Sequence, residues 1–182
     1  MRIKDMALLS MLSALAFVSV LLVKFPIMPS APFLRFDFKD AIIMAGGILY
    51  GPAAAFGVAF TVSMLQMMLV GESGITGFVM NLLSTSAFVC TVSAVYKLHR
   101  TRTGLIAGLA VGCLLMTASM LLWNYIITPY FMGVPREVVA SMLLTVFLPF
   151  NLLKGIINMA IVLLYIKPLF AVISAMNFYG EG

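Results

Sequence analysis

One lysine lies in the middle of a long apolar segment, with an asparagine on either side at helical spacing. Lys154 is the only charged residue within residues 138–166, and Asn151 and Asn158 lie one helical turn before and after it. Side chains at such spacings project from one face of a helix. A lysine at the centre of a membrane helix costs roughly 2.5 to 3.5 kcal/mol on insertion scales, so it is kept where it faces a cavity or a partner. The three side chains therefore predict one wall of a polar pocket.

The composition indicates an integral membrane protein. Of the 182 residues, 63% are hydrophobic and 9% are charged, whereas soluble domains average about 25% charged residues. The net charge of +5 reports orientation rather than nucleic-acid binding, because no basic run contains interleaved aromatic residues. The two cysteines, Cys90 and Cys113, lie in apolar runs without metal-ligand spacing, which predicts packing roles. We expect an all-α membrane protein in which residues 1–182 form a single domain.

The apolar segments predict six transmembrane helices, since a spanning helix needs about 20 apolar residues. The first, at residues 6–23, is basic and then apolar like a signal peptide, but we expect it to be retained. The uncharged run 41–71 is too long for one span, and Tyr50-Gly51-Pro52 should divide it into two. The remaining spans are expected at 75–96, at 103–127 with Pro129 following its end, and within 138–166, which Pro168 should stop.

The basic residues predict the orientation of these spans. Six spans place both termini on one side, and that side collects Arg2, Lys4, Lys167 and the basic loop 97–102. The opposite side mixes basic and acidic residues. Because basic loops stay inside the cell, both termini are expected in the cytoplasm. The predicted location is the cell membrane of a prokaryote.

With this orientation, polar residues of the last four spans reach one depth near the outer surface. Gln66 and Asn124 lie near the outer ends of their spans, and Asn81 lies in an outer third. Asn151 and Lys154 lie roughly 5–10 Å below the outer boundary, at about 1.5 Å of rise per residue. These residues predict an outward-facing pocket, over which the charged segment 33–40 could fold as a lid.

Several of these side chains have a second interpretation. A membrane asparagine often bridges two helices, which is the favoured role for Asn81 and Asn158. Trp123, together with Tyr125, Tyr130 and Phe131, could form the aromatic belt of the outer interface. The charges of Asp37, Lys39 and Asp40 could belong to a solvated loop.

The pocket suits a flat solute with polar edges, because amides satisfy donors and acceptors, aromatic rings cover ring faces, and Lys154 donates to a carbonyl or an anion. The chain has no phosphate-binding G-x-x-x-x-G-K-[ST] motif and no apparent inverted repeat, so partner subunits are expected. His99, the only histidine, lies in the basic loop, and no carboxylate pair or Ser–His couple appears. We therefore expect no enzyme. A purely structural subunit would leave Lys154 unexplained.

Three segments carry a resemblance to a known family, namely residues 33–40, Trp123-Asn124-Tyr125 followed by Pro129-Tyr130-Phe131, and Pro149-Phe150-Asn151-Leu152-Leu153-Lys154-Gly155. They resemble the riboflavin-specific S components, the substrate-binding subunits of energy-coupling factor transporters. The resemblance covers nearly the whole chain. It implies a high-affinity binder of riboflavin that opens to the outside, with riboflavin as the transported ligand and no separate cofactor. It also implies docking on a transmembrane coupling subunit that carries two cytosolic ATPases.

The resemblance also implies roles for individual residues. Asn124, Asn151 and Lys154 would hydrogen-bond the isoalloxazine edge or the ribityl chain. The segment 33–40 would gate the site, and Tyr130 and Phe131 would line it. The other candidate substrate-binding residues, to which the motifs assign no individual contact, are Leu34, Phe36, Asp37, Gln66, Asn81 and Trp123. The small pair Ser10 and Ala14 stands where the family usually has Ala-xxx-Ala and would let the partner approach. An S component for another vitamin, a stand-alone permease and a membrane enzyme remain the alternatives.

Overall fold

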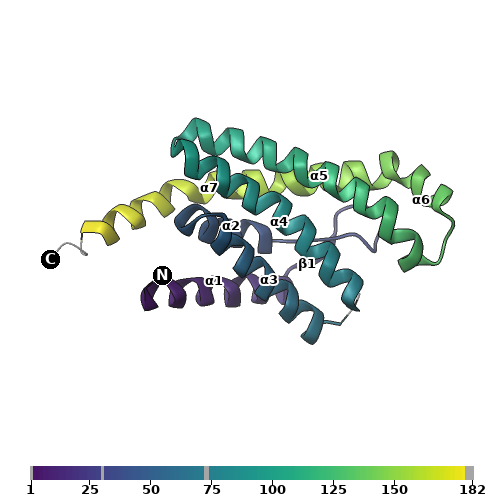
Figure 1. The fold of residues 1–182 in the computed structure, drawn as a ribbon, viewed down its shortest axis with the longest axis horizontal. Coiled ribbons are helices and arrows are strands. Elements are labelled where there is room, and N and C mark those ends of the chain that lie inside the picture. The colour runs from purple at the N-terminus through teal and green to yellow at the C-terminus, as the bar shows by residue number, and fades with distance from the viewer. Residues whose placement is uncertain (1, 30, 72–73, 179–182) are drawn as a thin grey trace.

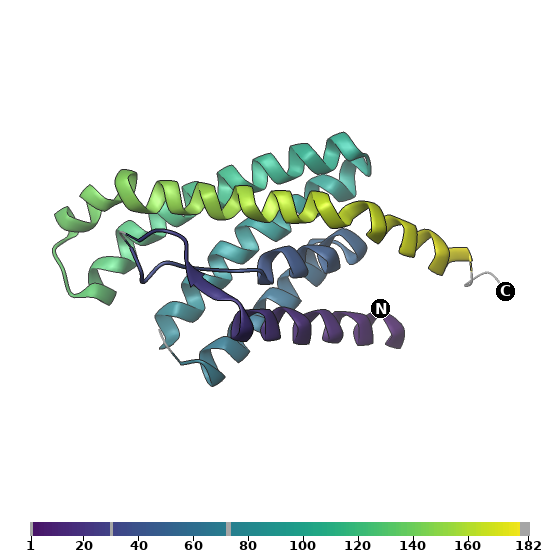
Figure 2. The same ribbon diagram turned by 180° about the vertical axis from the view of Figure 1, so that it is seen from behind.

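The computed structural model describes residues 2–29, 31–71 and 74–178, with side chains described as far as residue 171. Nearly all of this chain is helical, and the helices run side by side in one elongated bundle (Figure 1). Both termini lie towards the same end of the bundle, as the reverse view in Figure 2 also shows. The elements are α1 (Ile3–Leu22), β1 (Lys24–Pro26), β2 (Arg35–Asp37), α2 (Lys39–Tyr50), α3 (Pro52–Leu69), α4 (Gly74–His99), α5 (Arg102–Met132), α6 (Arg136–Met142), the π-helix η1 (Leu143–Phe147) and α7 (Leu148–Phe178).

Within the described residues, five helices are long and apolar enough to cross a membrane. They are Ile3–Leu22, Pro52–Leu69, Gly74–His99, Arg102–Met132 and the continuous helix Arg136–Ala171. The remaining expected span, the first part of the run 41–71, corresponds to α2, which has 12 residues and is about 18 Å long at 1.5 Å per residue. That length is well short of the roughly 30 Å hydrocarbon core. Helix α2 is instead the innermost helix, with buried residues from Lys39 to Ile48.

The predicted break in the long apolar run is confirmed. Helix α2 ends at Tyr50 and α3 begins at Pro52. Gly51 between them has φ +90°, which a residue with a Cβ rarely adopts, and proline suits the first turn of α3 because no N–H is needed there.

Two expected helix ends were wrong. Pro129 lies inside α5, which continues to Met132 and is capped by Gly133 in the left-handed conformation. Pro168 lies inside α7, which continues to Phe178. A proline removes one backbone donor without stopping a membrane helix, because neighbouring groups satisfy the freed carbonyl.

The extended segments before α2 form a short hairpin that the sequence did not predict. Strands β1 and β2 pair antiparallel, with Lys24 opposite Asp37 and Pro26 opposite Arg35. The part of the supposed loop 33–40 that follows β2 is already the first turn of α2. The hairpin thus leads the chain directly into the bundle interior.

Helices α4 and α5 approach closely because glycines face α4. A Cβ added to Gly112 would lie 3.1 Å from the Phe88 carbonyl oxygen and 2.8 Å from Val92 Cγ2. Gly108 is in a similar position, 3.3 Å from the Val92 carbonyl oxygen. Small residues that bring backbones together are a common means of packing helices in a bilayer.

Helix α7 begins after a widened turn. The Leu148 N–H donates to the Leu143 carbonyl oxygen five residues earlier, which defines η1. Pro149 follows directly and has no N–H to donate to the Thr145 carbonyl, so the regular ladder is interrupted here. Farther along α7, the Tyr165 hydroxyl donates to the Ala41 carbonyl oxygen at 2.8 Å and fastens α7 to α2.

Candidate functional site

A cavity of about 530 Å³ lies between the hairpin segment and helices α3, α4, α5 and α7. This size is within the range of roughly 300–1,000 Å³ that is usual for small-molecule sites. Of the residues predicted to contact a solute, those that line the cavity are Leu34, Asp37, Gln66, Asn81, Asn124, Phe131, Asn151 and Lys154. The polar residues that were predicted to share one depth therefore line a single cavity, which is built by four helices and the segment after β1.

Three predicted residues do not line the cavity. Phe36 is fully buried and packs against Phe25 and Phe38, with ring centroids 5.8 and 5.2 Å apart. Trp123 is half-buried, and Tyr130 is 78% exposed. On α5 the cavity stripe is Asn124, Ile127, Thr128 and Phe131. Positions 123 and 130 each precede a stripe residue by one, about 100° around the helix. Trp123 and Tyr130 therefore lie on α5 outside the stripe that lines the cavity.

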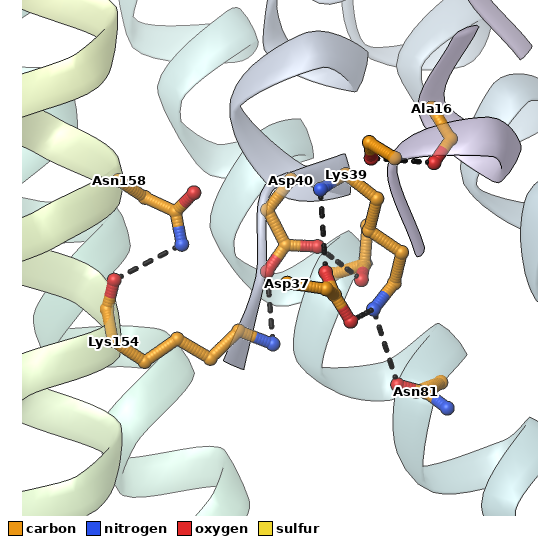
Figure 3. A network of polar contacts seen from close by, with 9 residues as sticks. Ala16, Asp37, Lys39, Asp40, Asn81, Lys154 and Asn158 are labelled. Atoms are coloured by element: carbon orange, nitrogen blue, oxygen red, sulfur yellow. Dashed lines mark hydrogen bonds and ion pairs between the residues drawn. The ribbon is translucent and has the colours of Figure 1, made fainter. Parts of the chain in front are cut away.

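Lys154 is paired with a buried carboxylate. Its Nζ lies 2.9 Å from Asp40 Oδ2, and both side chains are almost completely buried. Asp40 also accepts a 2.6 Å hydrogen bond from the Thr85 hydroxyl. Figure 3 shows the Lys154 side chain extending from α7 towards the first turn of α2. The costly charge is therefore neutralised within the protein, and the expectation that Asp40 could lie in a solvated loop was wrong.

A second buried ion pair lies beside the first. Lys39 Nζ is 2.7 Å from Asp37 Oδ2, and it donates to Asn81 Oδ1 at 3.3 Å (Figure 3). Lys39 and Asp37 are also buried, which excludes the solvated-loop interpretation for them. Asn81 accordingly bridges α4 to α2 while lining the cavity, so both of its proposed roles fit its position. The two ion pairs, Lys154–Asp40 and Lys39–Asp37, together form a cluster without net charge.

The asparagines on α5 and α7 are held by their own helices. Asn124 Nδ2 donates to the Met120 carbonyl oxygen at 2.7 Å, and Asn151 Nδ2 donates to the Phe147 carbonyl oxygen at 2.8 Å. Each amide keeps further hydrogen-bonding capacity, since the group carries two donors and an oxygen with two lone pairs. Both are buried, and these hydrogen bonds hold each amide against its own helix.

Asn158 differs from the prediction. It is fully buried and lies outside the cavity lining, and its Nδ2 donates to the Lys154 carbonyl oxygen at 3.0 Å. It neither forms part of the cavity wall nor donates to another helix. Asn151 and Lys154 line the cavity, whereas Asn158 lies one helical turn further along α7, beyond the end of the lining.

Two buried side chains on α3 lack partners within the described part of the chain. They are Ser63 Oγ and Gln66 Oε1, and both residues line the cavity. An unsatisfied buried polar atom is costly, so such atoms are candidates for hydrogen bonds to a solute. Ser63 was missed in the sequence because a single serine in an apolar helix gives no distinctive pattern.

Apolar and aromatic groups complete the cavity. Phe33 packs edge-on against Phe147, with ring centroids 6.3 Å apart, where the hairpin segment meets η1. Leu34, Met80 and Met120 add apolar surface. In the described part of the chain, no group of three histidine, cysteine or carboxylate side chains could hold a metal ion.

Ser10 and Ala14 lie outside the packed face of α1, roughly 100° around the helix from its centre. Both are exposed, whereas Ser13, Ala16 and Val20 face the bundle. This placement leaves the small pair open to a neighbouring helix.

The comparisons with known proteins agree on one family. A family model described as "ECF transporter, substrate-specific component" matches residues 4–166. The chain is 30% identical over 177 residues to the riboflavin transporter FmnP of Bacillus subtilis, covering 92% of this chain and 93% of the relative. It is 32% identical over 169 residues to the riboflavin transporter RibU of Staphylococcus aureus, covering 89% and 88%. A structure described as the S component of a bacterial ECF transporter superposes with a TM-score of 0.81 at 30% identity, covering 93% of this chain and 97% of that one.

Proposed function

The chain belongs to the substrate-specific components of ECF transporters, and from this premise we propose that it is a high-affinity riboflavin-binding subunit. It captures riboflavin outside the cell and delivers it inward through an ATP-driven partner module. The family is one of transport proteins, so the chain is not an enzyme. Its apolar helices and bacterial relatives make it a multi-pass protein of the prokaryotic plasma membrane.

The observation that carries the proposal is the gathering of Asn124, Asn151 and Lys154 on one cavity of about 530 Å³ in a chain whose relatives are named riboflavin transporters. The isoalloxazine ring of riboflavin is flat and carries carbonyl and ring-nitrogen groups along one edge. Asn151 has its Nδ2 bound to the Phe147 carbonyl, so its oxygen is oriented to accept from that edge. Gln66 and Ser63, whose buried oxygens lack partners in the described chain, suit the hydroxyls of the ribityl group.

Orientation follows from the charges and the hairpin. Six crossings, with α2 and the extended segment before it serving together as one of them, place both termini in the cytoplasm and open the cavity outward. Residues 33–40, from the cavity-lining Phe33 and Leu34 to the first turn of α2, form the gate. Residues 1–182 act as one domain, and the exposed pair Ser10 and Ala14 faces the coupling subunit, which carries two cytosolic ATPases.

The test compares two asparagines on α7. Asn151 and Asn158 are both buried, and both donate to the carbonyl four residues earlier. Only Asn151 lines the cavity. Asn151→Leu should weaken riboflavin binding about tenfold or more, because a lost hydrogen bond of about 1–2 kcal/mol corresponds to roughly that factor. Asn158→Leu should leave the affinity within about twofold, while both variants change the free energy of unfolding by a similar amount.

Binding is measured by quenching of riboflavin fluorescence on the purified full chain in neutral detergent. Equal loss of affinity in both variants would contradict the cavity assignment. Wild-type protein that binds thiamine or biotin instead of riboflavin would support an S component for another vitamin. Accumulation of riboflavin by vesicles that contain only this chain, without ATP, would favour a stand-alone permease.

A further inference from the structure

A second, smaller cavity lies at the other end of α2. Its volume is about 260 Å³, and it is lined by the last residues of α2 with Gly51, by Tyr96, Lys97 and Arg100 at the end of α4, and by Phe170 of α7. Tyr96 and Phe170 stack with ring centroids 5.9 Å apart and form one side. The ends of α2 and α4, which line this cavity, lie towards the end of the bundle that carries both termini (Figure 1). It does not share a lining residue with the larger cavity.

This cavity is lined by two cations and no acid. Neither Lys97 nor Arg100 forms an ion pair with a described carboxylate, whereas the described ion pairs elsewhere join Arg2 to Asp5, Lys39 to Asp37 and Lys154 to Asp40. Asp5 lies beside the Tyr50 side chain of the lining, but it is paired with Arg2, whose Nε lies 3.9 Å from Asp5 Oδ2 and whose backbone N–H donates to the same carboxylate at 2.9 Å. The hollow is therefore a positively charged site that an anion would complete.

The backbone at Arg100 is strained. Its φ of +41° makes it the one non-glycine residue in the described chain with a positive φ. The left-handed conformation is unfavourable for a residue with a Cβ, and glycine is the usual residue at such a helix end. The Arg100 N–H donates to the Tyr96 carbonyl oxygen at 2.8 Å, which closes α4 and turns the chain at the edge of the cavity. Such strain is often found at functional sites.

We propose that this cavity binds the phosphate group of an anionic phospholipid of the cytoplasmic leaflet. The guanidinium of Arg100 presents paired N–H donors that match phosphate oxygens, and Lys97 adds a compact charge. A lipid rather than a dissolved ion is favoured by the setting, because the same end of the chain carries Arg2, Lys4, Arg102 and Lys167. Basic clusters on the cytoplasmic side attract anionic lipids. The choice of leaflet rests on the proposed orientation.

Native mass spectrometry of the full chain in neutral detergent tests the inference. We expect dioleoyl phosphatidylglycerol to bind one-to-one and at least tenfold more tightly than dioleoyl phosphatidylcholine. The double variant Lys97→Gln/Arg100→Gln should weaken phosphatidylglycerol binding about tenfold. The control Lys4→Gln/Arg102→Gln removes the same charge from the same end but changes no cavity-lining residue, so it should bind the lipid like the wild type.

Three results would overturn the inference. Phosphatidylglycerol could bind the cavity variant as it binds the wild type, or the control variant could lose as much binding. Inorganic phosphate at millimolar concentration could displace the lipid completely, in which case the ligand is the free ion. Lys97 also lies beside the last turn of α2, where a cation stabilises a helix end, so folding of each variant is checked by riboflavin titration at the larger cavity. That titration also separates failure of this inference from failure of the riboflavin proposal.

Discussion

The buried pair Lys154–Asp40 should control folding as well as binding. Its atoms lie 2.9 Å apart, and almost no water reaches either side chain. Removing one partner of such a pair costs about 3–5 kcal/mol because the other charge stays buried without compensation. Lys39 does not take the place of Lys154 as a partner of Asp40, because its ammonium already binds Asp37 at 2.7 Å and Asn81. Lys154→Met and Asp40→Asn should therefore each destabilise the chain by about that amount.

The double variant Lys154→Met/Asp40→Asn should recover much of this loss. Replacing both members leaves a cluster with no net charge, and neutral replacements of buried pairs are often tolerated. We expect the double variant to lie within about 1–2 kcal/mol of the wild type, which implies a coupling energy of at least about 4 kcal/mol when each single variant loses about 3–5 kcal/mol. Riboflavin affinity should stay reduced in the double variant, because Lys154 lines the cavity and its ammonium is gone.

The free energy of unfolding is measured by titrating the ligand-free protein in mixed micelles with a denaturing detergent, and affinity by riboflavin fluorescence. Single variants as stable as the wild type, or losses that simply add in the double variant, would refute the ion-pair argument. A double variant with wild-type affinity would show that Lys154 acts only through Asp40 and not on the ligand.

Three further predictions concern packing, the unpartnered oxygens and docking. Gly112→Ala should destabilise the chain by about 1–3 kcal/mol in the same unfolding assay, because its Cβ would lie 3.1 Å from a backbone oxygen of α4. Gly57→Ala, where nothing lies within 4 Å, should stabilise it by about 0.4–1 kcal/mol, and similar effects at both sites would contradict the close-packing argument. Gln66→Met should leave the ligand-free protein as stable as before but weaken riboflavin binding about tenfold in the fluorescence titration, since it removes a buried oxygen without a partner in the described chain. Ser10→Leu/Ala14→Leu should keep riboflavin binding and lower uptake in cells at least fivefold, whereas normal uptake would place the docking surface elsewhere.

The bundle could be predicted from the sequence wherever the signal is local. Apolar length located the long helices, and a glycine–proline pair located the turn between α2 and α3. The shared depth of Gln66, Asn81, Asn124 and Lys154 followed from helical rise, and these residues do line one cavity. Each inference needed only neighbouring residues and a bilayer of known thickness.

The contacts between distant segments could not be predicted in this way. Asp40 is 114 residues from Lys154, and no sequence pattern near either residue predicts their pairing. The charges at 37–40 looked like a surface loop because prolines precede them, whereas the hairpin turns them into the protein. The sequence predicts helix ends at Pro129 and Pro168, but both prolines lie inside helices. A helix surrounded by other helices tolerates the loss of one backbone N–H donor.

The position of α2 bears on how a captured molecule can leave. In its first turn, Asp40 forms an ion pair with Lys154, which lines the larger cavity. Its last turn lines the smaller cavity at the opposite end. Two internal ion pairs, each costly to separate, hold that first turn in place. We therefore expect α2 to stay fixed, so that a molecule held in the larger cavity does not pass through the middle of the bundle.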